Sequence, residues 1–277
     1  MAVLHSSIHR AALWISLTIF AIILFYGCGQ QPDKIAEKSI VTDSIKKTSD
    51  LITADTLFKQ SLYDSAFIYY KRAADNFEKQ GKKKELIDVL LKISDLQRLK
   101  GDLESAMSII DKAEKITDPT KTVEQRMYAD VLHKKGLLLN NKGLFDSAIS
   151  VLNSSLSYKI KLFGERDTSL SLNYNLLGIS YFYKGEYDNA LTNYTKAYEI
   201  ALKRKNPEDA DLAMFLLNIG IINAQKGKYE EAEAAFTRAL KINEKLLKSD
   251  DPELSMINLN VGRLKALLNK DSEALDY

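Results

Sequence analysis

The 277-residue sequence is poor in the residues that build covalent or metal-stabilised sites. It has one cysteine, Cys28, so neither an intrachain disulfide nor a multi-thiolate metal site can form. Of its three histidines only His133 lies beyond the first ten residues, which excludes a histidine cluster in the body of the chain. There are 4 prolines and 12 glycines, whereas 45% of the residues are hydrophobic. These counts favour long helices around a sizeable core.

The sequence also lacks an excess of charge of either sign. Lys and Arg total 39 against 37 for Asp and Glu, which leaves a formal net charge of +2. This balance gives no general attraction to nucleic acid. No glycine-rich loop that could cradle a phosphate is present, because the segment around Gly227 has the pattern of a turn between helices. We therefore expect no nucleic-acid partner, no cofactor and no metal.

The N-terminus has a different composition from the rest of the chain. Ala11–Tyr26 is a run of sixteen uncharged residues, intermediate in length between the core of a signal peptide and a membrane-spanning helix. Gly27 followed by Cys28 resembles the lipobox of bacterial lipoproteins, in which the cysteine is lipidated, although Phe25 is bulkier than that motif usually carries. The sequence predicts lipidation of Cys28. An uncleaved anchor helix is the main alternative, and an ordinary secretion signal is the third.

Both leading interpretations attach the protein to a membrane, since acyl chains or an apolar helix would each hold it there. We assign residues 1–27 as a signal peptide or membrane anchor. Residues 28–47 are polar and charged with scattered aliphatic residues, so we expect a flexible tether. The resemblance to lipoproteins implies a membrane-anchored protein on the extracytoplasmic, periplasmic side of a bacterial cell.

From residue 48 onward the sequence repeats itself. Two sets of glycines recur at intervals of 42 residues: Gly136, Gly178, Gly220 and Gly262, and Gly101, Gly143, Gly185 and Gly227. Small and large apolar residues recur in register with them, for instance Ala148, Ala190 and Ala232. Spacings of three and four place these side chains on one face of a helix. A period of this length, repeated at many positions, indicates a stacked repeat architecture.

This pattern resembles the tetratricopeptide repeat (TPR), and its length is similar to the extended repeats of kinesin light chains. The resemblance implies an all-α fold, a right-handed superhelical solenoid of antiparallel helix pairs. Residues 48–277 would form about five repeats plus an incomplete last one. The first copy departs from the pattern, because Ala54 stands in the place of the first glycine set.

The recurring residues have predictable physical roles. Glycines such as Gly178 would lie in the first helix of each repeat, where the second helix approaches closely. We expect alanines such as Ala190 to be their partners, and large residues such as Tyr194 to fill the space between layers. The second glycine set, including Gly185, would end the first helix in a left-handed conformation.

A catalytic site finds little support in the sequence. A nucleophile, histidine and acid arrangement would depend entirely on His133, which is more simply a polar residue on a helix face. Carboxylate pairs such as Glu230 and Glu231 are typical of solvated faces or helix starts. We therefore predict a protein that is not an enzyme.

The resemblance implies instead a scaffold that binds a peptide or partner protein in the concave groove lined by the first helices. Groove candidates are the polar and aromatic residues of the first helices that the packing stripe does not use. They are His133, Asn140, Asn175, Phe182, Asn218, Gln225, Asn260 and Arg263. The alternative is that these residues form hydrogen bonds with neighbouring helices or water.

A second function stays open at the C-terminus. Asp271–Tyr277 matches only the opening of a second helix. This pattern is also compatible with the sensory region of a longer bacterial receptor, such as a histidine kinase or a transcriptional regulator. The identity of the partner protein is not encoded in any motif of the chain.

Overall fold

The computed structural model describes residues 49–204, 209–246 and 252–267, apart from the side chains of 252–256, 263 and 267. Nearly all of these residues belong to the unit Asp50–Tyr277. The predicted signal peptide or anchor and the predicted tether, with Cys28, lie outside the described residues, as does the C-terminal segment from Asp271.

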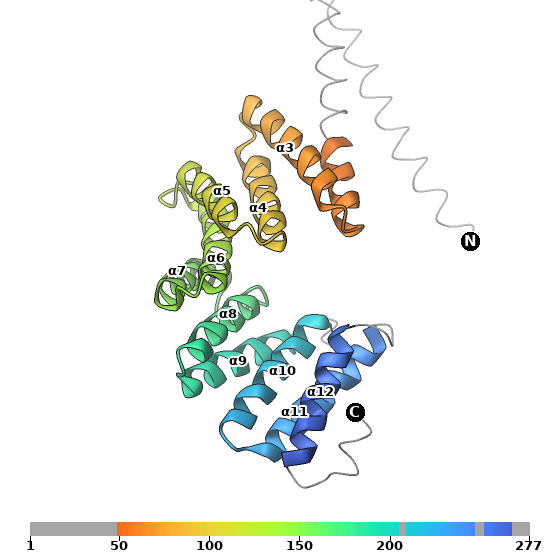
Figure 1. The fold of residues 1–277 in the computed structure, drawn as a ribbon. Helices are drawn as coiled ribbons and strands as arrows, with labels where there is room; N and C mark the ends of the chain where they lie inside the picture. The colour runs from red at the N-terminus through yellow and green to blue at the C-terminus, as the bar shows by residue number, and fades with distance from the viewer. Residues whose placement is uncertain (1–48, 205–208, 247–251, 268–277) are drawn as a thin grey trace, which may run out of the picture. The chain divides into compact units, whose positions relative to one another are not determined.

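The described residues form α-helices joined by short turns, with no strand among them (Figure 1). A helical segment covers residues 49–59. The elements that follow are α3 (Tyr63–Lys79), α4 (Lys83–Leu99), α5 (Leu103–Ile116), the 3₁₀ turn η1 (Thr122–Glu124), α6 (Gln125–Asn141), α7 (Phe145–Phe163), α8 (Leu170–Tyr183), α9 (Tyr187–Ala201), α10 (Ala210–Gln225), α11 (Tyr229–Leu246) and α12 (Pro252–Leu267).

The helices pair in the order predicted from the repeat. We call the segment 49–59, α4, α6, α8, α10 and α12 the first helices, and α3, α5, α7, α9 and α11 the second helices. Each first helix from α4 to α10 packs against the second helix that follows it and against the one before it. The first helices α4 and α8 also contact α6, which lies between them in the stack. The predicted all-α superhelical solenoid is confirmed.

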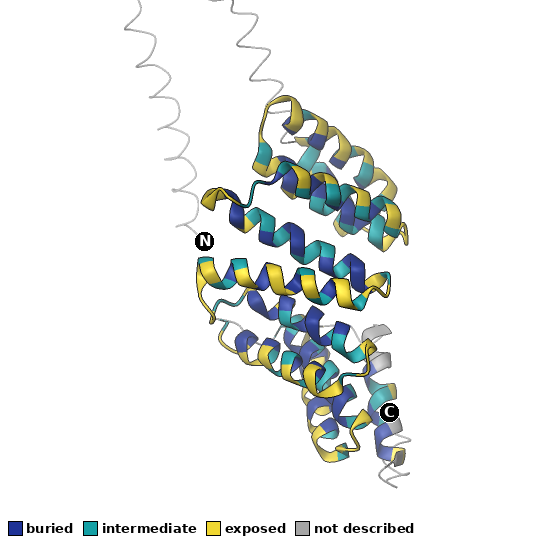
Figure 2. Cartoon of the chain, turned by 90° about the vertical axis from the view of Figure 1, so that its left-hand side faces the viewer, coloured by how far each residue is buried: buried dark blue, intermediate teal, exposed yellow. Residues whose placement is uncertain are grey.

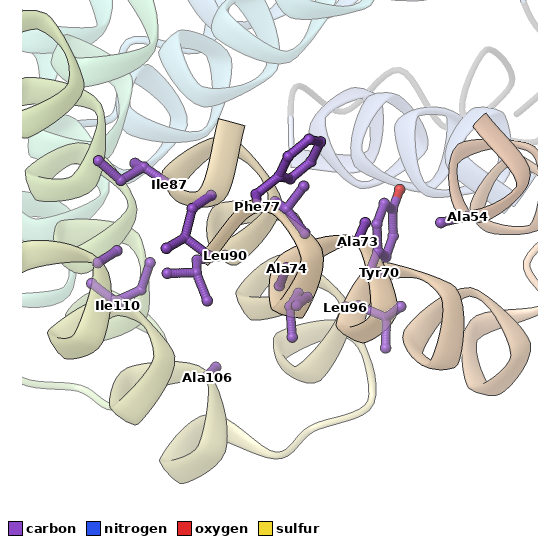
Figure 3. Packing of buried hydrophobic residues seen from close by; sticks show 14 of the residues in the cluster. Ala54, Tyr70, Ala73, Ala74, Phe77, Ile87, Leu90, Leu96, Ala106 and Ile110 are labelled. Carbon is purple, nitrogen blue, oxygen red and sulfur yellow. The ribbon is translucent and has the colours of Figure 1, made fainter. Parts of the chain in front are cut away.

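The two kinds of helix differ in burial because they occupy different layers. First helices such as α8 have few exposed residues, whereas the second helices are amphipathic and expose one side (Figure 2). In the first two repeats the buried core includes Ala54, Tyr70, Ala73 and Ile110 (Figure 3). A second helix therefore covers its repeat on one side and faces solvent on the other.

The glycines of the first helices lie where a large side chain of the same repeat packs. A Cβ atom added to Gly178 would stand 2.5 Å from Cδ1 and Cε1 of Tyr194. Gly136 meets Leu152 and Gly220 meets Phe236 at the same distance. The close approach that we expected at these glycines is thus present.

The atoms nearest to these glycines belong to a larger residue than the alanine expected opposite them. We expected small residues on both helices, with alanines such as Ala190 opposite the glycines. The nearest side-chain atoms belong to the large residue sixteen positions after each glycine, and Ala190 is buried four residues earlier on the same helix. The glycine therefore makes room for an aromatic or leucine side chain.

The second glycine set ends the first helices as predicted. Gly101, Gly143, Gly185 and Gly227 have φ between 71° and 81°. At Gly101 the amide donates to the carbonyl of Arg98, and the next amide, of Asp102, donates to the carbonyl of Gln97. This pair of hydrogen bonds is a Schellman motif, which closes a helix through a left-handed residue. In the first copy Ser61 takes this conformation, with φ of 59°.

Ion pairs between neighbouring repeats follow the same turns. The lysine before each of these glycines contacts an acidic residue in the first turn of the preceding second helix. The pairs are Lys100 with Asp64 at 2.5 Å, Lys142 with Glu104 at 2.7 Å, Lys184 with Asp146 at 2.7 Å, and Lys226 with Asp188. We call this series the lysine ladder. Because each of its ion pairs joins two neighbouring repeats, the ladder helps to fix the register between repeats rather than to stabilise any one helix.

Candidate functional site

The side of the first helices that faces away from the second helices is the candidate site, and we call it the first-helix face. In repeat 4, Gly178 marks the side of α8 that faces α9. Successive residues of an α-helix turn by about 100°, so Leu172 and Ile179 lie about 120° and 100° away from that side. Neither side chain is fully buried, and Leu172 is 37% exposed. These positions are the ones a ligand could reach.

Asn140 is not on this accessible surface. Its side chain is buried; its amide donates to the carbonyl of Leu176 at 2.9 Å, and its Oδ1 accepts from the hydroxyl of Ser180 at 2.7 Å. Both partners belong to α8, the first helix of the next repeat. Asn140 therefore joins two repeats, as the alternative interpretation proposed.

Asn175 and Asn218 form a similar link one repeat further on. The side-chain amide of Asn218 donates to Oδ1 of Asn175 at 2.8 Å, and the amide of Asn175 lies 3.9 Å from Sδ of Met214. Asn175 is buried, whereas Asn218 is half-buried. These two predicted groove residues are brought together, but their hydrogen-bonding groups are directed at each other.

His133 belongs to a polar network that spans three helices. Asn173 donates to the hydroxyl of Ser155 through its amide, so its Oδ1 is the acceptor that His133 Nδ1 approaches at 2.8 Å. The buried ammonium of Lys159 also donates to this oxygen at 3.2 Å and pairs with Asp130 at 3.1 Å. Nδ1 of His133 must therefore carry the proton.

This environment keeps His133 neutral. Burial, reinforced by the positive charges of Lys159 and Lys134, lowers the pKa of His133 to about 3. The imidazole thus stays uncharged at neutral pH and links α6 to α8 through Asn173. Its position supports the structural interpretation given above.

The other candidates differ in accessibility. Phe182 is half-buried and contacts the rings of Tyr183 and Tyr187, with centroids 5.3 Å and 5.9 Å away. Gln225 is exposed at the end of α10, and Asn260 is half-buried on α12. Arg263 lies in α12, and its side chain lies outside the described part of the chain.

Among the described residues, no group of three or more His, Cys, Asp or Glu side chains could hold a metal ion. Of the helices in the same ranges, none is both long and apolar enough to cross a membrane.

The comparisons with known proteins agree with this geometry. The sequence profile of the tetratricopeptide repeat family matches residues 127–203 and 211–277, together just over half of the chain. The chain belongs to the tetratricopeptide repeat family. No curated protein sequence matches it.

Several solved structures share the tetratricopeptide fold at low sequence identity. BtubC (BKLC) from P. vanneervenii is 18% identical with a TM-score of 0.58, over 84% of this chain and 87% of the other. A putative kinesin light chain repeat protein from Podosopora anserina is 15% identical with a TM-score of 0.57, over 69% and 90%. A chain of the Cut9 and Hcn1 hetero-tetramer of APC/C is 16% identical with a TM-score of 0.62, and the match covers 80% of this chain and 36% of the other. At these identities the likeness shows the fold alone.

The sequence prediction missed a charged part of this TPR surface. Lys92 donates to Asp55 at 2.6 Å, and Lys134 donates to Asp95 at 2.5 Å, each from one first helix to the preceding one. The hydroxyl of Tyr70 also donates to Asp55 at 2.6 Å, and these two bonds hold the pKa of the Asp55 carboxyl below its usual value despite partial burial. A cleft of about 300 Å³ lies here, lined by Asp55, Phe58, Lys59, Tyr70, Lys92 and Asp95.

An apolar part of the first-helix face was also missed. Leu137, Ile179, Met214 and Ile221 are half-buried, while Leu172 is more exposed. Tyr183, 66% exposed, stacks on Phe145 at the edge of this region. The 42-residue register could have revealed these positions. Aliphatic residues on a largely apolar helix carry no signal that separates an exposed position from a core position.

Proposed function

We propose that this chain is a non-catalytic scaffold that binds a partner protein on its first-helix face. Proteins of the tetratricopeptide repeat family typically mediate protein–protein interactions. The proposal rests on which side chains of the first helices are paired within the stack and which are accessible. The polar residues predicted to hold a ligand mostly pair within the stack, whereas the aliphatic side chain of Leu172 stays accessible.

Accessible aliphatic side chains in a row are the usual source of affinity for a partner, because docking removes their apolar area from water. A solenoid offers such a row over several repeats without changing its own backbone. The hetero-tetramer of Cut9 and Hcn1, which has a similar fold, supports assembly with another protein as the mode of action.

Substitutions on the two sides of the stack test this proposal. Leu172→Glu combined with Ile221→Glu places charges on the first-helix face, at a position that is 37% exposed and at one that is half-buried. Ile68→Glu, 51% exposed on the second helix α3, is the matched control. All variants should keep the helical circular dichroism of the wild type. Partner recovery by affinity capture should fall at least about tenfold for the double variant alone, and equal recovery from double variant and control would refute the assignment.

We further propose that the N-terminal segment holds this array at a membrane, through lipid on Cys28 or through an uncleaved helix, on the extracytoplasmic side of a bacterial cell. Support comes from the uncharged run Ala11–Tyr26 and the Gly27–Cys28 pair. Cys28→Ser should move the protein from the detergent phase to the aqueous phase in a phase-separation assay. Continued partitioning into detergent would favour the anchor helix over the lipid.

A further inference from the structure

The junction between α7 and α8 is polar at positions where the neighbouring repeats are apolar. Its buried side chains include Ser155, Lys159 and Asn173. The same positions one repeat before and one repeat after are apolar and 0% exposed: Val131 and Phe215 for Asn173, and Ala113 and Ala197 for Ser155. The stack can therefore be packed at these positions without polar groups. Packing alone does not account for this network.

An amine, a carboxamide and a carboxylate meet in this junction. Nζ of Lys159 donates to Oδ1 of Asn173 at 3.2 Å and lies 3.1 Å from Oδ1 of Asp130. Lys159 is 6% exposed and Asn173 is 0% exposed, whereas the side chain of Asp130 is 43% exposed. The amine and the carboxamide are thus held in contact away from water, and the carboxylate connects them to solvent.

Two further hydrogen bonds fix the carboxamide of Asn173. Nδ1 of His133 donates to its Oδ1 at 2.8 Å, and its Nδ2 donates to the hydroxyl of Ser155 at 2.8 Å. A fixed N–H donor at a carbonyl oxygen stabilises the negative charge that develops there when a nucleophile adds to the carbon. His133 is placed to supply this donor, and Ser155 orients the amide nitrogen that would leave.

We propose that Lys159 and Asn173 form an intramolecular isopeptide bond that joins α7 to α8. Lys159 passes one proton to Asp130, and its uncharged amine adds to Cγ of Asn173. A second proton of the amine passes to Nδ2, the bond between Cγ and Nδ2 breaks, and ammonia leaves. Asp130 then returns its proton to the ammonia. One C–N bond forms and one breaks, so the step needs neither an oxidant nor a cofactor.

The fold favours this reaction in two ways. Because α7 and α8 hold Lys159 and Asn173 in contact, the reaction is effectively unimolecular. Proton transfer from Lys159 to Asp130 also removes two opposite charges, one of them buried. The product would be a covalent link between two repeats of the stack, which goes beyond the proposed scaffold function and does not depend on any partner.

Mass spectrometry of the full-length protein tests the inference. The released ammonia should leave the wild type lighter by about 17 Da than the same chain without the bond. In a tryptic digest, residues 143–161 and 167–184 should stay joined as one branched peptide, because trypsin does not cleave after a lysine whose amine is acylated. The wild type by itself therefore decides whether the bond forms.

Variants assign the roles of the residues. Lys159→Arg keeps a positive charge without the amine, and Asn173→Val introduces the residue of the preceding copy, Val131. Both should lack the branched peptide and retain the mass of the ammonia, and Asp130→Asn should lose most of the branched peptide. Lys161→Arg, at an exposed position of α7, is the matched control and should form the bond as the wild type does.

Circular dichroism of each variant separates loss of the bond from loss of the fold. Unlinked peptides with free Lys159 and intact Asn173 in the wild type would overturn the inference. A loss of ammonia that persists in Lys159→Arg would also overturn it, because an asparagine that cyclises on its own backbone loses the same mass. Partner capture measures the scaffold function separately, so either proposal can fail without the other.

Discussion

The close contact between Gly178 and Tyr194 allows a prediction whose sign depends on the neighbouring residue. Gly178→Ala places a Cβ 2.5 Å from two ring carbons of Tyr194, which is only 3% exposed and cannot swing into solvent. Overpacking of this kind costs about 1–3 kcal/mol. Replacing a mid-helix glycine by alanine returns about 0.5–1 kcal/mol. The net expectation is a loss of up to about 2.5 kcal/mol.

The same substitution should become stabilising when the ring is removed. In a Tyr194→Ala background the steric term is gone, so Gly178→Ala should raise stability by about 0.5–1 kcal/mol, the helix-propensity gain alone. Urea unfolding followed by circular dichroism at 222 nm measures all four members of this cycle. The midpoints are compared directly, because repeat arrays can depart from two-state unfolding.

A second glycine serves as the control. Gly185 has φ of 78° and no heavy atom within 4 Å of its would-be Cβ. Gly185→Ala should therefore cost roughly 1–2 kcal/mol through backbone strain, equally with and without the ring of Tyr194. The steric explanation is refuted if Gly178→Ala stabilises the wild type, or if its cost is the same in both backgrounds.

Three further predictions concern the links between repeats. Asn140→Ala removes two buried hydrogen bonds between repeats, those to Leu176 and Ser180, and should lower stability by about 1–3 kcal/mol in urea unfolding, whereas the exposed control Asn153→Ala should change it little. His133 has a folded pKa of about 3, below its unfolded value near 6.5, so its contribution to stability is complete above about pH 6.5 and is lost as the pH falls toward 3. His133→Gln should therefore reduce the drop in melting temperature between pH 7 and pH 5. An unchanged drop would contradict the environment assigned to His133. Lys142→Glu should destabilise the stack by less than about 1 kcal/mol, and adding Glu104→Lys should restore stability at low salt only.

Much of the fold was predictable because it depends on local pattern. Gly101 and Gly143 were assigned to left-handed helix ends from spacing alone, and their φ values of 81° and 73° agree. In the first copy, Ala54 and Tyr70 stand at the positions of the later glycines and large residues, and both lie in the same buried core. Glycine tolerates backbone conformations and close contacts that other residues do not, so its position in the sequence indicates its role. The 42-residue period repeats this indication in several copies.

The candidate site was less predictable because its residues are neighbours only in space. Asn140 and Ser180 are 40 residues apart, and Asn175 and Asn218 are 43 apart. On a helical wheel each asparagine is simply a polar residue off the packing stripe. Whether it faces solvent or the next repeat depends on how consecutive helix pairs are rotated, which the sequence of one helix does not state.

The sequence alone determined the all-α repeat, its period and the positions where backbone or side-chain size is restricted, since these follow from local conformation and from spacing along a helix. Tertiary structure decided which side chains fill the restricted positions and which polar residues are used up between repeats. The ring of Tyr194 provides the atoms nearest to Gly178 because α9 packs against α8. Asn140 is buried between two repeats because α8 stacks on α6, whereas Leu172 on α8 stays 37% exposed.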